Sequence, residues 1–201
     1  PDIYTAHIYS NGGDFIDTHT LSNIYIDDEH EKNIGTININ AQEKRIVWQI
    51  GESTRTTEGF KFSSQLRNYI WKDLVPNNLI YTVGQSNKDD WYYLQSDNGA
   101  WKIQFNSDLI KNYDNLKLSI ALAGATQKNM LNDTGASISI YLNDKRIKNK
   151  NLSNDRASYR SSLRSGAYHL VETKIYKDDI NKGINEFLIK TDGYLMYDTI
   201  I

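Results

Sequence analysis

Aromatic, arginine and histidine side chains gather in one short stretch of the chain, and this mixture offers the most chemistry in the sequence. The stretch contains Tyr159, Arg160, Arg164, Tyr168 and His169. An aromatic ring packs on the apolar C–H face of a pyranose, and a planar guanidinium binds a carboxylate through two parallel hydrogen bonds. We therefore predict a carbohydrate-binding surface here. The alternative is that these arginines are ordinary surface residues that brace a loop.

A second mixture of this kind lies earlier in the chain. Trp91 directly follows Asp89 and Asp90, so an aromatic face adjoins groups that can hydrogen-bond to sugar hydroxyls. Trp91 is equally consistent with a place in the core. Arg55, in a polar stretch that follows an apolar run, is a further candidate contact for a sugar.

Other chemistries lack the residues or the spacing that they require. The chain has no cysteine, which excludes disulfides, thiolate metal sites and cysteine nucleophiles. No serine lies in a Gly-x-Ser-x-Gly motif, so serine hydrolase chemistry has no support. The four histidines do not show metal-ligand spacing; they are His7, His19, His30 and His169.

Clusters of carboxylates occur at residues 27–29, 89–90 and 178–179. Such runs can hold calcium, but each is more often an ordinary solvated loop, and no calcium motif is present. We therefore expect no cofactor, with a structural calcium ion as the open alternative.

The charge of the chain argues against two classes of binding partner. The formal net charge is −2, and there is no polybasic run, which argues against nucleic acid and anionic membranes. No apolar run approaches the roughly eighteen residues of a transmembrane helix. The 14 tyrosines and 4 tryptophans are many for so polar a chain, and some of them are expected at a contact surface.

Short alternating apolar runs separated by turn residues predict an all-β fold, a jelly-roll β-sandwich. One helical segment is expected at residues 64–74, and one turn at residues 177–181. The expected strands are residues 3–10, 15–20, 21–26, 34–39, 46–51, 79–84, 91–95, 101–105, 116–123, 138–142, 168–175, 185–190 and 195–201.

The strand at residues 46–51 marks a boundary between two domains. Ile46, Trp48 and Ile50 share one face of it and need a core to meet. The three or four strands expected before residue 45 do not close a sandwich. We therefore interpret residues 1–44 as the end of a domain whose beginning is missing, and residues 45–201 as the jelly-roll domain.

Five blocks of this sequence, in this order, resemble the C-terminal domain of the rhamnogalacturonan endolyases of polysaccharide lyase family 4. They are Trp48–Gly51, Leu79–Gly84, Trp101–Phe105, Leu118–Ala125 and Tyr194–Asp198. The segments Tyr4–Gly12 and Ile34–Thr36 resemble the end of that family's fibronectin-type-III-like middle domain. The chain departs from the family pattern after Gly51, where the usual Pro-Asp is absent.

The resemblance implies a carbohydrate-binding-module-like jelly roll, in a secreted enzyme that degrades pectin by β-elimination. Cleavage belongs to an N-terminal catalytic domain that this chain lacks, so no catalytic residue is assigned and no turnover is expected. The implied partners are that catalytic domain and an acidic plant cell-wall polysaccharide, rhamnogalacturonan I. The alternatives are a structural or adhesion module that contacts protein, and a self-contained enzyme, for which no acid–base constellation is visible.

Overall fold

The computed structural model describes residues 2–8, 19–27, 31–37, 46–64, 74–97, 99–128, 134–160 and 166–201. The chain forms two compact units, Pro1–Arg45 and Ile46–Ile201, which we describe separately. The helix expected at residues 64–74 and the strand expected at residues 15–20 lie largely outside the described residues. No described helix is long and apolar enough to cross a membrane.

In the described part of the first unit, two strands form an antiparallel pair. Strand β1 (Asp2–Ile8) pairs with β2 (His19–Ile26), and the register shifts between Tyr4 and Ala6. The strand expected at residues 34–39 is wrong over its described part, because residues 31–37 have no regular structure. Gly35 adopts a φ of +78° there, and its N–H donates to Asn33 Oδ1 at 2.8 Å, so a turn interrupts the extended chain. Assignment of this unit to a fibronectin-like domain stays a prediction.

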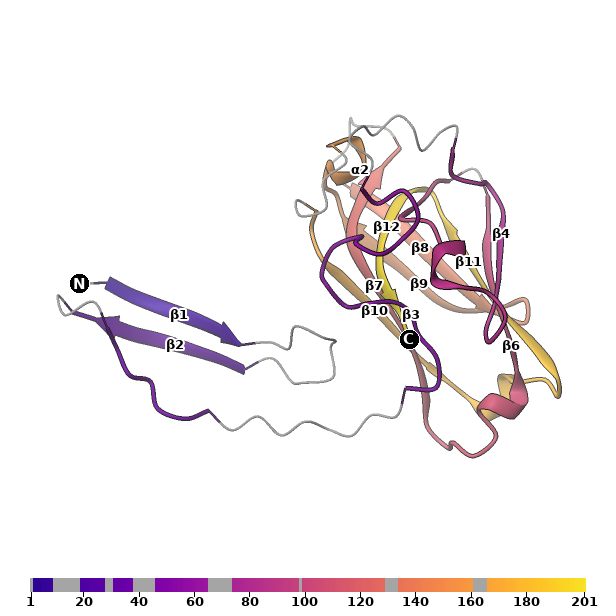
Figure 1. Cartoon of the computed structure of the whole chain (residues 1–201), viewed down its shortest axis with the longest axis horizontal. Coiled ribbons are helices and arrows are strands. Elements are labelled where there is room, and N and C mark those ends of the chain that lie inside the picture. Colours follow the sequence, from indigo (N-terminus) through magenta and orange to yellow (C-terminus); the bar gives the residue numbers. More distant parts are fainter. Residues whose placement is uncertain are drawn as a thin grey trace. The chain divides into compact units, whose positions relative to one another are not determined.

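In the described part of the second unit, the strands form two five-stranded sheets (Figure 1). The first sheet has the order β10-β7-β12-β3, with β5 also paired to β12, and the second has the order β4-β6-β11-β8-β9. All pairings are antiparallel except that of β4 with β6. The first sheet contains β3 (Ile50–Gly51), β5 (Leu94–Gln95), β7 (Leu116–Gln127), β10 (His169–Ile175) and β12 (Gly193–Ile200). The second contains β4 (Leu79–Thr82), β6 (Trp101–Asn106), β8 (Thr134–Leu142), β9 (Lys145–Ser153) and β11 (Ile184–Thr191).

The predicted all-β fold is confirmed, and its core consists of the residues that alternate inward from the strands. Residues of β6, β8 and β11 are buried at every second position, as expected for strands with one face on a core. Aromatic side chains fill the centre: Trp91 meets Trp101 edge-to-face at 5.1 Å between ring centroids, and Trp101 stacks on Tyr197 at 5.6 Å. Sandwich packing therefore holds the two sheets together.

Short helical turns connect the strands. They are η2 (Lys88–Asp90), η3 (Ser107–Leu109), η4 (Lys177–Asp179) and the one-turn helix α2 (Ala157–Arg160). The turn expected at residues 177–181 is confirmed by η4. Strand β9 was not among the expected strands, and the strand expected at residues 46–51 is shorter, since only Ile50 and Gly51 pair with β12.

Candidate functional site

The segment between β9 and β10 (residues 154–168) is anchored to β7 by the carboxylate of Asp155. Asp155 accepts hydrogen bonds from the backbone N–H groups of Ala125 at 3.0 Å, Ala157 at 2.8 Å and Ala167 at 2.9 Å. It also accepts from the Thr126 hydroxyl at 3.2 Å. Ala157 and Ala167 lie near the two ends of the segment, so Asp155 joins both ends to the same strand.

The far end of this segment also packs on the backbone of β7. A Cβ atom added to Gly166 would lie 2.0 Å from the carbonyl oxygen of Ala123, far inside contact distance. Only glycine permits so close an approach. The base of the segment therefore has a fixed position against the first sheet.

The predicted carbohydrate-binding residues of this segment are only partly visible. Tyr159 and Arg160 end helix α2, but the orientations of their side chains lie outside what the structure describes, as does Arg164 altogether. The predicted role of these three residues in binding sugar stays a prediction.

Two other predicted residues, distant in sequence, meet in the structure. The guanidinium carbon of Arg55 lies 4.7 Å from the centroid of the Tyr168 ring, a cation–π contact between the loop after β3 and the residue that precedes β10. The loop is anchored next to Arg55, where the Thr54 N–H donates to Asp198 Oδ1 at 2.8 Å. Arg55 covers one face of the Tyr168 ring, so that face is not open to a sugar.

His169 is half-buried next to this contact. Its pKa is lowered chiefly by burial and further by Lys150, against the opposing effects of Asp155 and of a hydrogen bond with the Ser153 backbone. Its Nε2 is buried and has no hydrogen-bond partner among the described residues. His169 is therefore neutral at pH 7 and adds no positive charge for a carboxylate.

The structure corrects the second predicted site. Trp91 has 0% of its surface exposed and lies in the aromatic core, so its role as a ligand contact is wrong. Asp90 is exposed, and its Oδ2 accepts the N–H of Asn87 at 2.8 Å within its own turn. As for calcium, no group of three histidine, aspartate or glutamate side chains in the described ranges is arranged to hold a metal.

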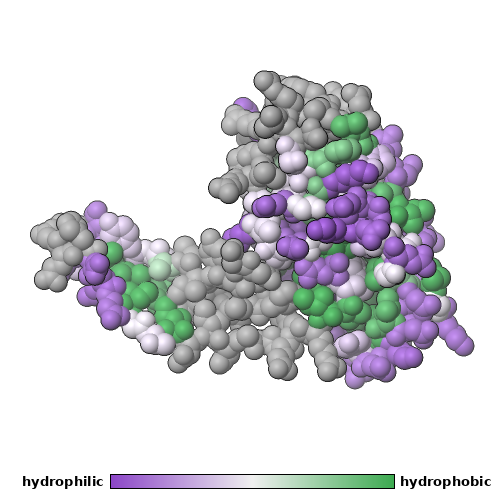
Figure 2. All heavy atoms as spheres, viewed as in Figure 1, coloured by the Kyte–Doolittle hydropathy of each residue, from purple (hydrophilic) through white to green (hydrophobic). Residues whose placement is uncertain are grey.

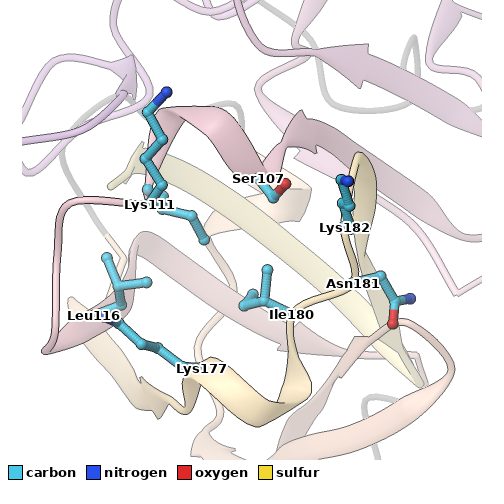
Figure 3. A pocket seen from close by; sticks show the side chains of 8 residues that line it. Ser107, Lys111, Leu116, Lys177, Ile180, Asn181 and Lys182 are labelled. Atoms are coloured by element: carbon cyan, nitrogen blue, oxygen red, sulfur yellow. The ribbon is translucent and has the colours of Figure 1, made fainter.

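A pocket that the sequence analysis did not predict lies between the η3 and η4 loops. Its volume is about 300 Å³. Apolar side chains of Ile110, Leu116 and Ile180 line it, together with the polar groups of Ser107 and Asn181, and Figure 3 shows Ile180 central among the labelled residues. The pocket thus combines an apolar floor with hydrogen-bonding groups.

Three lysines surround this floor, and they differ in how they are neutralised. Lys177 pairs with Asp114 at 2.5 Å, and this contact holds the pKa of the Asp114 carboxyl below its usual value. Lys111 is 3.9 Å from Asp108, and Lys182 has no ion pair with any described residue. Figure 3 shows the ammonium groups of Lys111 and Lys182 directed away from the floor, toward the same side. Such an arrangement can hold an anionic group above an apolar surface.

Partly buried hydrogen bonds stabilise the walls of the pocket. The Ser107 N–H donates to the Gly183 carbonyl oxygen at 2.8 Å, and the Gly183 N–H donates to the Ser107 hydroxyl oxygen at 3.0 Å. Asn185 is 1% exposed. Its Oδ1 accepts from the Asn181 N–H and from Asn143 Nδ2, each at 2.7 Å. Its Nδ2 donates to the carbonyl oxygens of Asn181 at 2.8 Å and Gly183 at 3.1 Å. The amide of Asn185 thus uses its full donor and acceptor capacity, so the η4 loop keeps its shape without a ligand.

Comparison with known proteins identifies the domain that carries these features. Residues 46–201 match the model of a family described as "CBM-like: Polysaccharide lyase family 4, domain III". The chain belongs to this family. The match covers the whole second unit and confirms the resemblance found in the five sequence blocks.

A curated relative extends the similarity over the full chain. A rhamnogalacturonate lyase from Dickeya dadantii (strain 3937) is 28% identical over 203 residues, which cover 100% of this chain and 34% of the relative. The chain thus spans about a third of the length of that lyase.

Solved structures show weaker similarities of fold. A family GH115 4-O-methyl-alpha-glucuronidase has a TM-score of 0.46 and 11% identity, over 85% of this chain and 19% of that one. A family 35 carbohydrate-binding module from Clostridium thermocellum has a TM-score of 0.32 and 15% identity, over 53% of this chain and 70% of that one. A family 35 module from an environmental isolate has a TM-score of 0.30 and 14% identity, over 51% and 61%. At these scores none of the three bears on the ligand of this chain.

Proposed function

We propose that this domain is the non-catalytic, carbohydrate-binding portion of a rhamnogalacturonan lyase, and that it binds acidic plant cell-wall polysaccharide outside the cell. The family match over residues 46–201 is the observation that carries this proposal. The catalytic domain would belong to the part of the lyase that this chain does not cover, consistent with its 34% share of the relative. The domain would hold the substrate near that catalytic domain.

The lysine-lined pocket supports binding of a uronate residue. The C–H face of a uronate ring would rest on Ile180, and its carboxylate would meet the ammonium of Lys182, which has no ion pair in the described part of the chain. Asn181 would bond to the sugar hydroxyls. The chain as a whole is slightly acidic, so binding a polyanion requires local positive charge of this kind.

Substitution of Lys182 tests this role. We expect Lys182→Ala to weaken binding of rhamnogalacturonan oligosaccharides about three- to tenfold at low salt, because one exposed charge contact of roughly 0.7–1.4 kcal/mol is lost. The dissociation constant from titration calorimetry is the measurement. Lys182 is exposed and forms no ion pair with described residues, so the melting temperature should not change.

Lys88→Ala is the matched control, because Lys88, in η2, is also an exposed lysine and does not line the pocket. It should bind like the unmodified chain. Equal affinities for the Lys182 and Lys88 variants would contradict a binding role for the pocket.

A further inference from the structure

The outer face of the second sheet carries a group of side chains that the pocket does not use. In β8 and β11, Ile140 and Ile189 point into the core and are fully buried. Because side chains alternate along a strand, Tyr141, Leu188 and Lys190 point outward. This face belongs to the three adjacent strands β11, β8 and β9 (Figure 1).

The strand register brings these outward residues together with residues of β9. Tyr141 lies opposite Leu188 on one side and Arg146 on the other, and the β8–β9 register shifts between Ile140 and Tyr141. Side chains directly opposite in antiparallel strands have Cβ atoms about 5 Å apart. The Lys190 ammonium lies over one face of the Tyr141 ring, 5.8 Å from its centroid, and occupies that face. One aromatic ring is therefore flanked by two cations, and we call Tyr141, Arg146 and Lys190 the tyrosine platform.

Hydroxyl and amide groups adjoin the platform along the same strands. Ser139 lies opposite Lys190 on β11 and opposite Asn149 on β9. The Ser139 hydroxyl and Asn149 Oδ1 are 3.4 Å apart, and Asn149 is exposed. These groups can bond to sugar hydroxyls beside the ring.

The charge on this face is positive. In the part of the chain that the structure describes, neither Arg146 nor Lys190 has a carboxylate partner. Glu186, an acidic side chain on the same face, is neutralised by Lys102 at 2.8 Å and accepts from Gln104 at 3.1 Å, and Asp192, in the turn after β11, accepts the Ser137 N–H at 2.6 Å. A surface with free cations on a chain of net charge −2 is complementary to a polyanion.

Strand β9 is the edge of its sheet and lies next to β10 of the first sheet: the Thr173 hydroxyl donates to the Ile147 carbonyl oxygen at 3.4 Å, and Lys150 Nζ donates to the Leu170 carbonyl oxygen at 2.9 Å. Hydrophilic residues predominate among the described residues on the side of the second unit seen in Figure 2, with hydrophobic residues interspersed between them. The apolar centre of the platform is small, because Leu188 is its one aliphatic neighbour among the residues named above. A polar and cationic strip with one aromatic ring fits an extended charged glycan better than a protein, whose interface would bury an apolar centre.

We propose that the tyrosine platform binds an extended strand of acidic polysaccharide, as a second contact surface separate from the lysine-lined pocket. This inference rests on the proposed carbohydrate-binding function. The face of the Tyr141 ring away from Lys190 stacks on the C–H face of a sugar, the Arg146 guanidinium binds a uronate carboxylate, and Lys190 approaches another acidic group of the same strand. Asn149 bonds to hydroxyls.

The test compares three single variants of the 201-residue chain on long-chain rhamnogalacturonan. Tyr141→Ala and Arg146→Ala should each weaken binding at least fivefold in affinity electrophoresis, while Arg146→Lys should recover part of the loss because a charge without the planar fork remains. Tyr141 and Arg146 lie on the sheet surface, and thermal unfolding of each variant establishes that the fold is intact.

Lys61→Ala is the matched control, since Lys61 is an exposed cation 5.0 Å from the Tyr92 ring, in a loop away from this sheet face. It should bind like the unmodified chain. Unchanged affinity of folded Tyr141→Ala and Arg146→Ala would overturn the platform. Weaker binding by Lys182→Ala would in that case still support binding at the pocket. Absence of polysaccharide binding by the unmodified chain would overturn the platform and the proposed function together.

Discussion

Asp155→Ala is expected to lower the free energy of unfolding of the second unit by about 2–4 kcal/mol. The carboxylate accepts three backbone N–H groups and one hydroxyl, and it joins both ends of the segment after β9 to β7. The buried Ala125 and Ala157 contribute two of those N–H groups. Removing the acceptor leaves donors without a partner, and this costs more than the hydrogen bonds themselves contribute. Urea denaturation followed by tryptophan fluorescence measures the change.

Asp155→Asn and Asp89→Ala complete this experiment. The asparagine variant keeps the size of the side chain but replaces one acceptor with a donor, so it should also be destabilised, though less than the alanine variant. Asp89 is exposed, and its substitution should change stability by less than about 0.5 kcal/mol. If Asp155→Ala unfolds at the same urea concentration as Asp89→Ala, the proposed fastening of this segment is wrong.

Gly51→Ala is expected to destabilise the second unit by about 2–4 kcal/mol, through backbone strain and steric overlap. Gly51 has a φ of +79°, which disfavours residues with a side chain. An added Cβ would lie 2.7 Å from the Asp198 carbonyl oxygen and 2.3 Å from Cζ of the buried Phe60. The β3–β12 pairing and the loop that carries Arg55 would both have to move. Thermal and urea denaturation measure the loss.

Gly59→Ala separates the two causes. Gly59 has a φ of +89°, but nothing lies within 4 Å of its added Cβ, so the substitution introduces strain without overlap. A cost of about 1 kcal/mol is expected there. Equal destabilisation by the two variants would show that crowding at Gly51 has no energetic effect.

The strands that the sequence predicted correctly are those with a dense apolar face. Residues 101–105 alternate without interruption, residues 185–190 contain the apolar run Phe187–Ile189, and both segments form inner strands of the second sheet. Strand β7 extends to Gln127, beyond the expected end at residue 123, because the small residues after Ala123 pair with β12. Pairing with a neighbouring strand can thus extend a strand through residues whose own composition does not predict one.

Strand β9 was missed because it is an edge strand. Among its nine residues, Ile147 and Leu152 are the aliphatic ones, and lysine, arginine and asparagine occupy most of the rest. Charged residues on an edge strand prevent pairing with other chains, but they also remove the alternation that predicts a strand. The tyrosine platform was missed for the same reason, since Arg146 becomes a neighbour of Tyr141 only through the β8–β9 register.

The site predictions succeeded or failed according to whether their residues are local in sequence. Trp101 lies inside the alternating run of residues 101–105, the strand expected there is confirmed, and the side chain is fully buried in the core. Trp91 lies between a charged turn and a short strand, so its burial was not predictable from its neighbours. The pocket joins Lys111 to Lys182 across two loops far apart in the chain, and only the fold brings them together.

Titration calorimetry of the unmodified chain tests the central claim most directly. The titrants are rhamnogalacturonan oligosaccharides and the same oligosaccharides with their carboxyl groups reduced to alcohols. We expect binding of the acidic oligosaccharides that weakens as salt is added, and at least about tenfold weaker binding of the reduced ones, because the cations of the pocket and platform lose their partners. No binding of either titrant, or equal affinity for both, would contradict the account.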